Sequence, residues 1–280
     1  MSLDGMQFCL VLPGLFQMGD DQYTDEKPQH SVDLAYPYFI ARFPVSVAQW
    51  REYLQRSGAR PDDERSTRGR DNEPAVFVTW HDAQRFCGFL TREWRKQIPS
   101  GFVVELPSEA EWEKAARGGQ RIPPGFNWVS LPRLIATVTA SAPDPTIANP
   151  FPDRTYPWGH PFDPDKANVD ATIAETSALG CYPSGCSPYG CEEMSGNVEE
   201  WTRSIWGKDI SKPDCVYPYD LNDRRREDST AGEDIYRVVR GGSWFPPHGG
   251  ARCAYRYYVQ PDSRDVVIGF RVVLRSAPVG

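Results

Sequence analysis

Tyr236-Arg-Val-Val-Arg-Gly-Gly-Ser-Trp244 and Ile268-Gly-Phe-Arg-Val-Val-Leu274 are the two segments of this chain with the clearest structural signal. Apolar residues occupy alternate positions in both, which predicts two half-buried strands. The segment that joins them is unusual, because loops are normally polar and rich in turn-forming residues. It carries bulky side chains instead, namely Phe245, Tyr255, Tyr257, Tyr258, Val259, Val266 and Val267. Apolar bulk outside a core indicates a surface that contacts another molecule.

The C-terminal motifs are Arg240-Gly-Gly-Ser-Trp244, Arg252-x-Ala-x-Arg256, Pro261-Asp262 and Gly269-Phe-Arg271. Upstream of them lie Leu12-Pro-Gly-Leu-Phe-Gln-Met-Gly19, Phe43-Pro-Val45, Trp50, Leu106-Pro-Ser-Glu-Ala-Glu-Trp-Glu-Lys-Ala-Ala-Arg-Gly-Gly119, Tyr156-Pro-Trp-Gly159, Ala167-Asn-Val169 and Met194-Ser-Gly-Asn-Val-Glu-Glu-Trp201. In this order they resemble the formylglycine-generating-enzyme (sulfatase-modifying factor) family, a branch of the C-type lectin folds. The resemblance implies an α+β fold of that type with much irregular structure. It also implies that a strand near Phe8–Leu12 lies beside Phe270–Leu274.

Helix start signals agree with an α+β chain. Ser46 with Gln49, and Ser108 with Glu111, form capping boxes, and Thr79 can cap a third helix. Gly58 and the pair Gly118-Gly119 would end the first and last of these helices.

Length and composition fit one globular domain over residues 1–280. Residues 120–153 contain seven prolines, and we interpret them as an insertion folded on the surface. With 38 acidic and 31 basic residues, the chain carries a net charge of −7, which argues against a nucleic-acid partner. No apolar run is long enough to span a membrane, and no signal peptide is evident. We expect a chain that is made and kept in the cytoplasm, or displayed on a larger particle.

Cys181, Cys186 and Cys191 recur every five residues, without the C-x-x-C spacing or nearby histidine of a zinc site. Buried small side chains are the preferred interpretation, and a disulfide within this loop is the alternative.

The positions at which this family carries out chemistry differ here. The resemblance implies that its oxidases hold copper between two cysteines, one directly after Gly-Gly-Ser-aromatic and one five residues later. This chain has Phe245-Pro-Pro-His-Gly-Gly250 there, and one cysteine cannot supply the two thiolates that a cuprous ion needs. Iron-dependent relatives use histidines, whereas His30, His81, His160 and His248 are far apart in this sequence. We therefore predict that the chain is not an enzyme and has no catalytic residue.

The same fold serves the variable proteins of diversity-generating retroelements, found in phages, prophages and bacterial genomes, in which adenine-directed mutagenesis diversifies a C-terminal segment. The resemblance implies such a variable region at residues 240–272, and a receptor- or tropism-type binding protein with an unknown protein ligand. The predicted ligand-binding residues all belong to the set that this mutagenesis can produce: Phe245, Pro246, Pro247, His248, Tyr255, Tyr257, Tyr258, Val259, Ser263, Asp265, Val266 and Val267. Trp244 and Gln260 fall outside that set and would be framework.

Physical chemistry supports a binding surface on a fixed frame. Arg252, Arg256 and Arg264 can hold irregular loops by binding backbone carbonyls. Tyrosines such as Tyr257 and Tyr258 provide stiff, amphipathic contact area. The alternative is that these tyrosines simply cover a neighbouring loop.

Structural calcium is a further expectation from the resemblance, and no other cofactor is required. One site would use Glu193 and Glu200 with the carbonyls of Gly196 and Val198, and a second would use Asn168, Val169 and Asp170. Oxygen ligands of this kind suit Ca²⁺. Salt bridges between these acids and nearby arginines are the alternative. Two other functions also remain open: an oxidase-family enzyme of the formylglycine-generating or iron-dependent type, and a retired homologue that acts as an accessory subunit.

Overall fold

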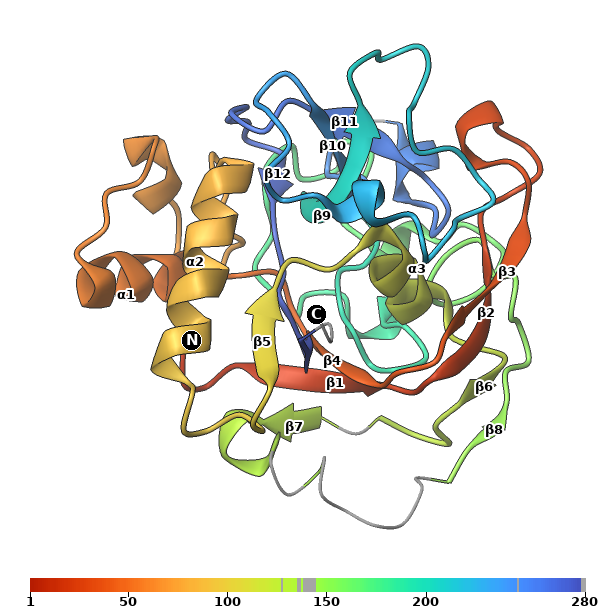
Figure 1. Cartoon of the computed structure of the whole chain (residues 1–280), viewed down its shortest axis with the longest axis horizontal. Helices are drawn as coiled ribbons and strands as arrows, with labels where there is room; N and C mark the ends of the chain where they lie inside the picture. The colour runs from red at the N-terminus through yellow and green to blue at the C-terminus, as the bar shows by residue number, and fades with distance from the viewer. Residues whose placement is uncertain (127, 135–136, 138–144, 246, 278–280) are drawn as a thin grey trace.

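Two antiparallel-rich sheets and three helices organise the chain, and long irregular segments connect them (Figure 1). The computed structural model describes residues 1–126, 128–134, 137, 145–245 and 247–277. Its strands are β1 (Gln7–Val11), β2 (Gly14–Met18), β3 (His30–Leu34), β4 (Tyr38–Ala41), β5 (Phe102–Glu105), β6 (Arg121–Ile122), β7 (Trp128–Ser130), β8 (Ile147–Ala148), β9 (Glu199–Gly207), β10 (Tyr236–Arg240), β11 (Tyr257–Val259), β12 (Ile268–Gly269) and β13 (Val273–Ser276). The helices are α1 (Val47–Ser57), α2 (Trp80–Glu93) and α3 (Glu109–Arg117), with short 3-10 turns between elements. The predicted α+β fold with much irregular structure is confirmed.

The larger sheet has the order β5-β13-β4-β1-β7. The prediction that the first and last strands lie side by side is wrong, because β4 lies between them. Its Ile40 is the register partner of Cys9 in β1 and of Val273 in β13. Strand β4 is buried at every position, because its alternate residues face the two hydrophobic clusters on opposite sides of the sheet.

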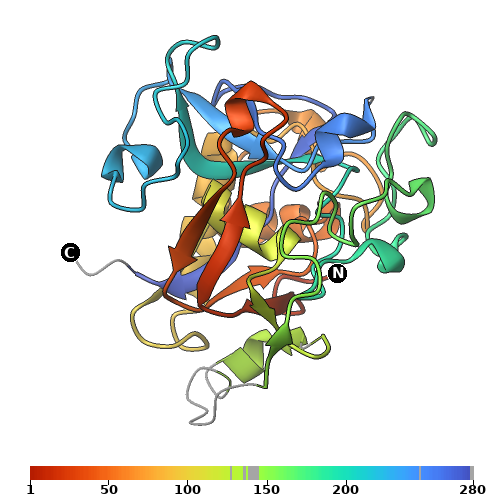
Figure 2. The ribbon, with the colours of Figure 1, turned by 90° about the vertical axis from the view of Figure 1, so that its right-hand side faces the viewer.

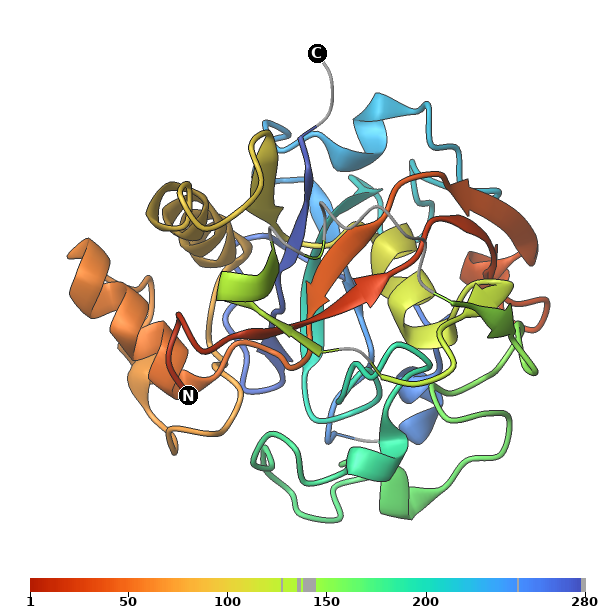
Figure 3. The same cartoon turned by 90° about the horizontal axis from the view of Figure 1, so that it is seen from below.

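The smaller sheet carries the C-terminal loops and has the order β11-β10-β9-β12. It lies at the top of Figure 1, and helices α1 and α2 lie together at one end of the molecule in Figures 1 and 3. The two-stranded β2–β3 ribbon occupies the opposite end and faces the viewer in Figure 2.

All three predicted helix starts are confirmed. Ser46, Thr79 and Ser108 each accept a hydrogen bond from the backbone N–H three residues later, and the residue there bonds back to the cap. Helix α1 ends at Gly58, which adopts the left-handed conformation that glycine tolerates best. Gly118 follows α3 with a positive φ of 86°.

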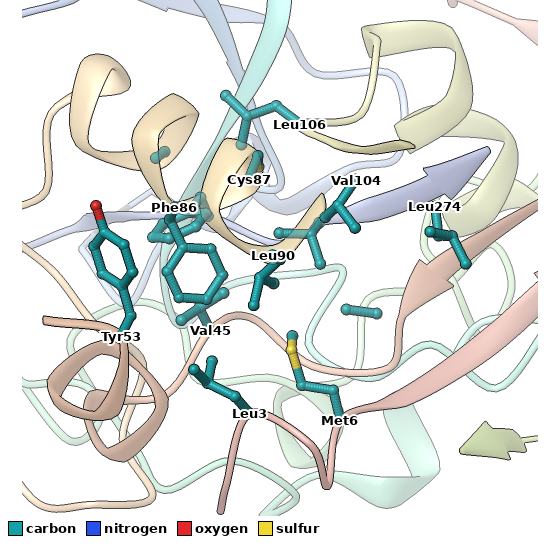
Figure 4. Close-up of a cluster of buried hydrophobic side chains, with 14 of the residues drawn as sticks. Leu3, Met6, Val45, Tyr53, Phe86, Cys87, Leu90, Val104, Leu106 and Leu274 are labelled. Carbon is teal, nitrogen blue, oxygen red and sulfur yellow. The ribbon is translucent and has the colours of Figure 1, made fainter. Parts of the chain in front are cut away.

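The main core lies between α1, α2 and the two sheets. Tyr53, Phe86 and Val104 meet there (Figure 4). The ring of Phe270 lies 5.2 Å from Phe86 in an edge-to-face arrangement, so the C-terminal Gly-Phe-Arg motif is anchored in this core. A second cluster surrounds α3 and includes Trp112.

Residues 120–153 differ from the expected surface insertion in one respect. Part of this segment forms β7, which pairs with β1 at the edge of the larger sheet. Val129 and Leu131 are buried in the main core. This part of the segment therefore contributes to the packing of the domain.

The cysteines are all unpaired, and burial varies along the predicted cysteine loop. Cys191 is buried, Cys186 is half-buried and Cys181 is exposed. The buried interpretation therefore fails for Cys181, because its loop turns outward. None of the described helices is both long and apolar enough to cross a bilayer.

Candidate binding site in the C-terminal loops

A cavity of about 940 Å³ opens on the C-terminal loops above the smaller sheet. We call it the C-terminal groove. Its lining residues are Tyr23, Glu199, Ile210, Tyr236, Gly242, Ser243, Phe245, Pro247, Gly249, Gly250, Arg252, Tyr255, Tyr257, Tyr258, Val259, Gln260, Ser263, Arg264, Asp265, Val267 and Ile268. A concave site lined by aromatic side chains and a few polar groups has the features of a ligand-binding site.

Strand pairing places the tyrosines in this groove. Tyr257 and Tyr258 of β11 pair with Val239 and Val238 of β10. The rings of Tyr255 and Tyr257 are stacked with centroids 6.4 Å apart, and those of Tyr257 and Tyr258 lie 5.1 Å apart. Tyr258 also contacts Trp206 of β9, with 4.6 Å between the ring centroids. The tyrosines therefore form one connected aromatic wall, with Tyr257 in the middle and Tyr258 packed on Trp206.

The loop that leads from β10 to the tyrosines begins at a tight glycine turn. Gly241 and Gly242 both have positive φ, at 95° and 62°. A Cβ on Gly242 would lie 2.6 Å from the backbone of Gly250, so only glycine permits the two ends of the loop to approach this closely.

The predicted ligand-binding residues fall into three groups. Those that line the groove are Phe245, Pro247, Tyr255, Tyr257, Tyr258, Val259, Ser263, Asp265 and Val267. His248 and Val266 lie outside the lining, and Pro246 lies outside the described residues. The most accessible aromatic residues are Phe245, with 61% of its surface exposed, and Tyr257, with 42%. Tyr255 and Tyr258 are half-buried.

His248 makes local contacts beside the groove. Its Nδ1 lies 2.6 Å from a carboxylate oxygen of Asp170, whose other oxygen accepts a 2.7 Å hydrogen bond from the His248 backbone N–H. The imidazole stacks on Phe162 at 4.1 Å. These contacts tie the loop after Gly242 to the Asp170 segment.

Arginines hold the loops largely through carboxylates. Arg252 donates two 2.7 Å hydrogen bonds to Glu26, and Arg256 donates to both oxygens of Glu109 at 2.7 and 3.0 Å. The prediction that Arg264 fixes a loop in the same way is wrong: Arg264 is exposed and lines the groove. It therefore belongs to the surface of the groove and not to the frame.

Sequence reasoning missed Glu199, which faces the groove from β9. Burial is the main reason that the pKa of its carboxyl rises to about 8, and the nearby charge of Asp265 raises it further. The adjacent Glu200 is fully buried and accepts hydrogen bonds from Arg271 and Trp112. The adjacent Glu199-Glu200 pair in the Met194–Trp201 motif was the available signal, because successive residues of a strand point to opposite faces.

Of the acids expected to bind calcium, Glu200 is engaged by an arginine, as described above. Glu193 accepts hydrogen bonds from the Gly180 N–H and the Asn197 side chain, and burial raises its pKa to about 7. The Oδ1 atom of Asn168 is buried without a hydrogen-bond partner. Gly196 packs on the Asn168 carbonyl so closely that a Cβ would lie 2.4 Å from it. The acceptor on Asn168 fits a cation, whereas the pairing of Glu200 with Arg271 does not. Val169 and Val198 are buried beside these residues, and calcium binding stays a proposal.

The four histidines do not meet. His30 contacts Pro28 and Tyr219, His81 has a buried Nε2 without a partner, and His160 lies near Asp153. Among the described residues, no group of three or more His, Cys, Asp or Glu side chains could hold a metal ion. The described residues therefore do not form an iron- or copper-binding set.

This groove is built on a recognised fold: the chain belongs to the family of sulfatase-modifying factor enzyme 1-like domains, which matches residues 2–276. It is 31% identical over 274 residues to a hercynine oxygenase of Mycolicibacterium smegmatis, covering 94% of this chain and 60% of that protein. Two solved structures share the fold. PvdO from Pseudomonas aeruginosa has 24% identity, 95% and 93% coverage of the two chains and a TM-score of 0.64. Treponema denticola variable protein 1 has 20% identity, 96% and 95% coverage and a TM-score of 0.63. The resemblance to the formylglycine-generating family is thus confirmed, and the fold is shared with a variable protein.

The prediction that the chain is not an enzyme is wrong, because a similar relative is named an oxygenase. The prediction rested on metal-ligating residues within this sequence alone. The chain spans only 60% of the length of that relative. The histidines and cysteines of this segment are therefore not a sufficient basis for the prediction.

Proposed function

We propose that this chain is a binding protein that recognises a protein ligand through the C-terminal groove. The observation that carries the proposal is the wall formed by Tyr255, Tyr257 and Tyr258 beside the exposed ring of Phe245. Stacked tyrosines provide large contact area at low entropic cost, as they do in antibody paratopes. Exposed aromatic side chains gathered in a concave site favour recognition over internal packing.

The rigid support beneath the groove favours the same function. Arg252 and Arg256 are buried and fix the loops to Glu26 and Glu109. Side chains on a surface held in this way can change with little effect on folding. This arrangement suits a diversified surface, as in the variable proteins. A repeat of the C-terminal codons with adenines at the groove positions, next to a reverse-transcriptase gene, would test diversification.

The binding proposal is tested with a double variant, Phe245→Ala with Tyr257→Ala. Both side chains are strongly exposed, so the variant should fold normally. A displayed peptide library is selected on the wild-type protein, and the dissociation constants of recovered peptides are measured for both proteins. We expect the double variant to lose about tenfold or more in affinity, the effect of removing central aromatic contacts.

Phe151→Ala is the matched control, because Phe151 is an exposed aromatic outside the groove lining. Its affinity for the same peptides should equal that of the wild type. Peptides that bind all three proteins equally would overturn the proposal, as would a library from which no peptide is recovered.

A second candidate is an oxygenase-family enzyme, favoured by the similarity to the hercynine oxygenase. The groove would then hold a small substrate. Hercynine-dependent oxygen uptake by the iron-loaded protein tests this candidate. Oxygen uptake that is lost in the Phe245→Ala/Tyr257→Ala variant would support the oxygenase candidate. Uptake no greater than that of an iron-only control would contradict it.

A further inference from the structure

Two successive glutamates on β9 have opposite environments. Glu200 faces the core, where Arg271 donates to its Oε2 at 2.6 Å and to its Oε1 at 2.7 Å. Glu199 faces the C-terminal groove, and within the described part of the chain its carboxyl forms no hydrogen bond or ion pair. The backbone N–H of Glu199 is bonded to the Val267 carbonyl at 2.8 Å, which fixes the position of the residue on the strand. The backbone of Glu199 is therefore fixed, whereas its carboxyl has no bonding partner in the described part of the chain.

In the described part of the chain, no positively charged side chain of the groove pairs with Glu199. Arg252 lines it but is bound to Glu26 at 2.7 Å. Arg264 lines it and is exposed, and no ion pair joins it to Glu199 among the residues described. Asp265 adds a second negative charge and is close enough to raise the pKa of Glu199 after the larger effect of burial. The local field at Glu199 is consequently negative.

Tyr255, Tyr257 and Tyr258 line the same groove as this acid. Burial chiefly, and the charge of Glu199 next, raise the pKa values of Tyr255 and Tyr257. Both hydroxyl-bearing rings therefore lie within the electrostatic reach of the carboxyl. The faces of tyrosine rings attract cations through the ring quadrupole. A carboxylate and aromatic faces in one cavity make a complementary environment for a positively charged group.

We propose that the C-terminal groove takes a positively charged amidinium, guanidinium or ammonium group of its ligand, paired with the Glu199 carboxylate and flanked by the tyrosines. This inference rests on the proposed function and specifies the ligand chemistry of the same site. In a protein ligand, the group would be the side chain of an arginine or lysine. Arg264, at the exposed edge of the groove, adds discrimination, since it would repel a second cation there.

The test uses benzamidinium, neutral benzamide and anionic benzoate, which share one ring and differ in charge. Their dissociation constants are measured by calorimetric titration with the wild-type protein, Glu199→Gln and Glu64→Gln. Glu64 is exposed and outside the groove, so its variant is matched for chemistry and net charge. We expect benzamidinium to bind the wild type and Glu64→Gln about tenfold more tightly than benzamide. Glu199→Gln should lose this preference while retaining its affinity for benzamide.

Equal or tighter binding of benzamide or benzoate would overturn the cation inference and leave the groove as a binding site. Unchanged benzamidinium affinity in Glu199→Gln would also overturn it. If none of the three probes binds, the inference fails, and the separate peptide selection decides whether the proposed function fails with it.

Discussion

Buried arginine–glutamate pairs fix the loops of this protein at the scale of single residues. Helix α3 supplies two of the acids: Glu109 meets Arg256, and Glu113 meets Arg240. The Arg240 guanidinium also donates to the carbonyls of Ala254 and Cys253, which are loop groups without a strand partner. Charged groups are costly to bury unless they are paired. Each pair is therefore stabilising only as long as both partners are present.

Replacing Arg256 by Ala should reduce the free energy of unfolding by about 3 kcal/mol, because it leaves the buried Glu109 with only the more distant Arg226, at 4.0 Å, as a counter-charge. Arg264→Ala is the control, since Arg264 is exposed, and should change stability by less than about 0.5 kcal/mol. Urea denaturation of the two variants measures the difference. Similar losses for both would refute the division into frame and surface arginines.

Glu199 gives a pH-dependent prediction. A carboxyl with an ordinary pKa near 4.3 in the unfolded chain and about 8 in the folded protein holds its proton more strongly when folded. Stability from this group is therefore greatest below about pH 4 and falls as pH rises toward 8. Glu199→Gln removes that decline. At pH 8 the variant should be more stable than the wild type by about 1–2 kcal/mol, after allowance for partial exposure of the carboxyl.

Thermal unfolding of the wild type and Glu199→Gln at several pH values checks this result. The difference should shrink as the pH is lowered toward 4. A difference that is constant with pH would mean that Glu199 does not titrate in this range.

At the scale of elements, the helices could be predicted closely and the sheets only in part. Capping boxes are local, so Ser46 and Ser108 identified helix starts without tertiary information. Strand neighbours depend on contacts between distant segments, and nothing in the sequence of β4 indicated that it separates β1 from β13. Aromatic residues in a loop predicted a contact surface in the C-terminal segment. Glu199 was missed because the sequence did not show that β9 lies beside that segment.

Tyr257 and Tyr258 are neighbours in the sequence but differ in exposure on β11. Tyr257 is exposed, so Tyr257→Ala should change the unfolding free energy by no more than about 0.5 kcal/mol. Tyr258 is half-buried against Trp206, and Tyr258→Ala should cost about 1–2 kcal/mol through lost aromatic packing. Chemical denaturation of the two single variants makes the comparison. The reverse order of stabilities would contradict the placement of these rings.

At the scale of the whole molecule, the first strands, α3 and the C-terminal loops form one connected structure. The single side chain of Arg271 joins Glu200 of β9 to the carbonyls of Ala41 and Arg42 at the end of β4. The family motifs predicted this fold because they supply the paired charges and tight turns. The ligand chemistry could not be predicted in the same way, because it depends on which groove residues face one another.

Calcium would stabilise the whole domain if it binds at Asn168 or Glu193. A ligand that binds only the folded state adds about 2.7 kcal/mol at a hundred times its dissociation constant. We expect chelation to lower the melting temperature of the wild type, and calcium to restore it. Asn168→Ala and Glu193→Gln should each weaken the response of one site. A melting temperature that is indifferent to both chelator and added calcium would rule out a tightly bound ion.

The most direct measurement is the crystal structure of this protein with a peptide selected for binding to it. We expect the peptide to lie in the C-terminal groove, in contact with Phe245 and Tyr257, and to place a cationic group beside Glu199. A peptide bound on another face, with the tyrosine wall still open to solvent, would contradict the assignment of this groove as the binding site.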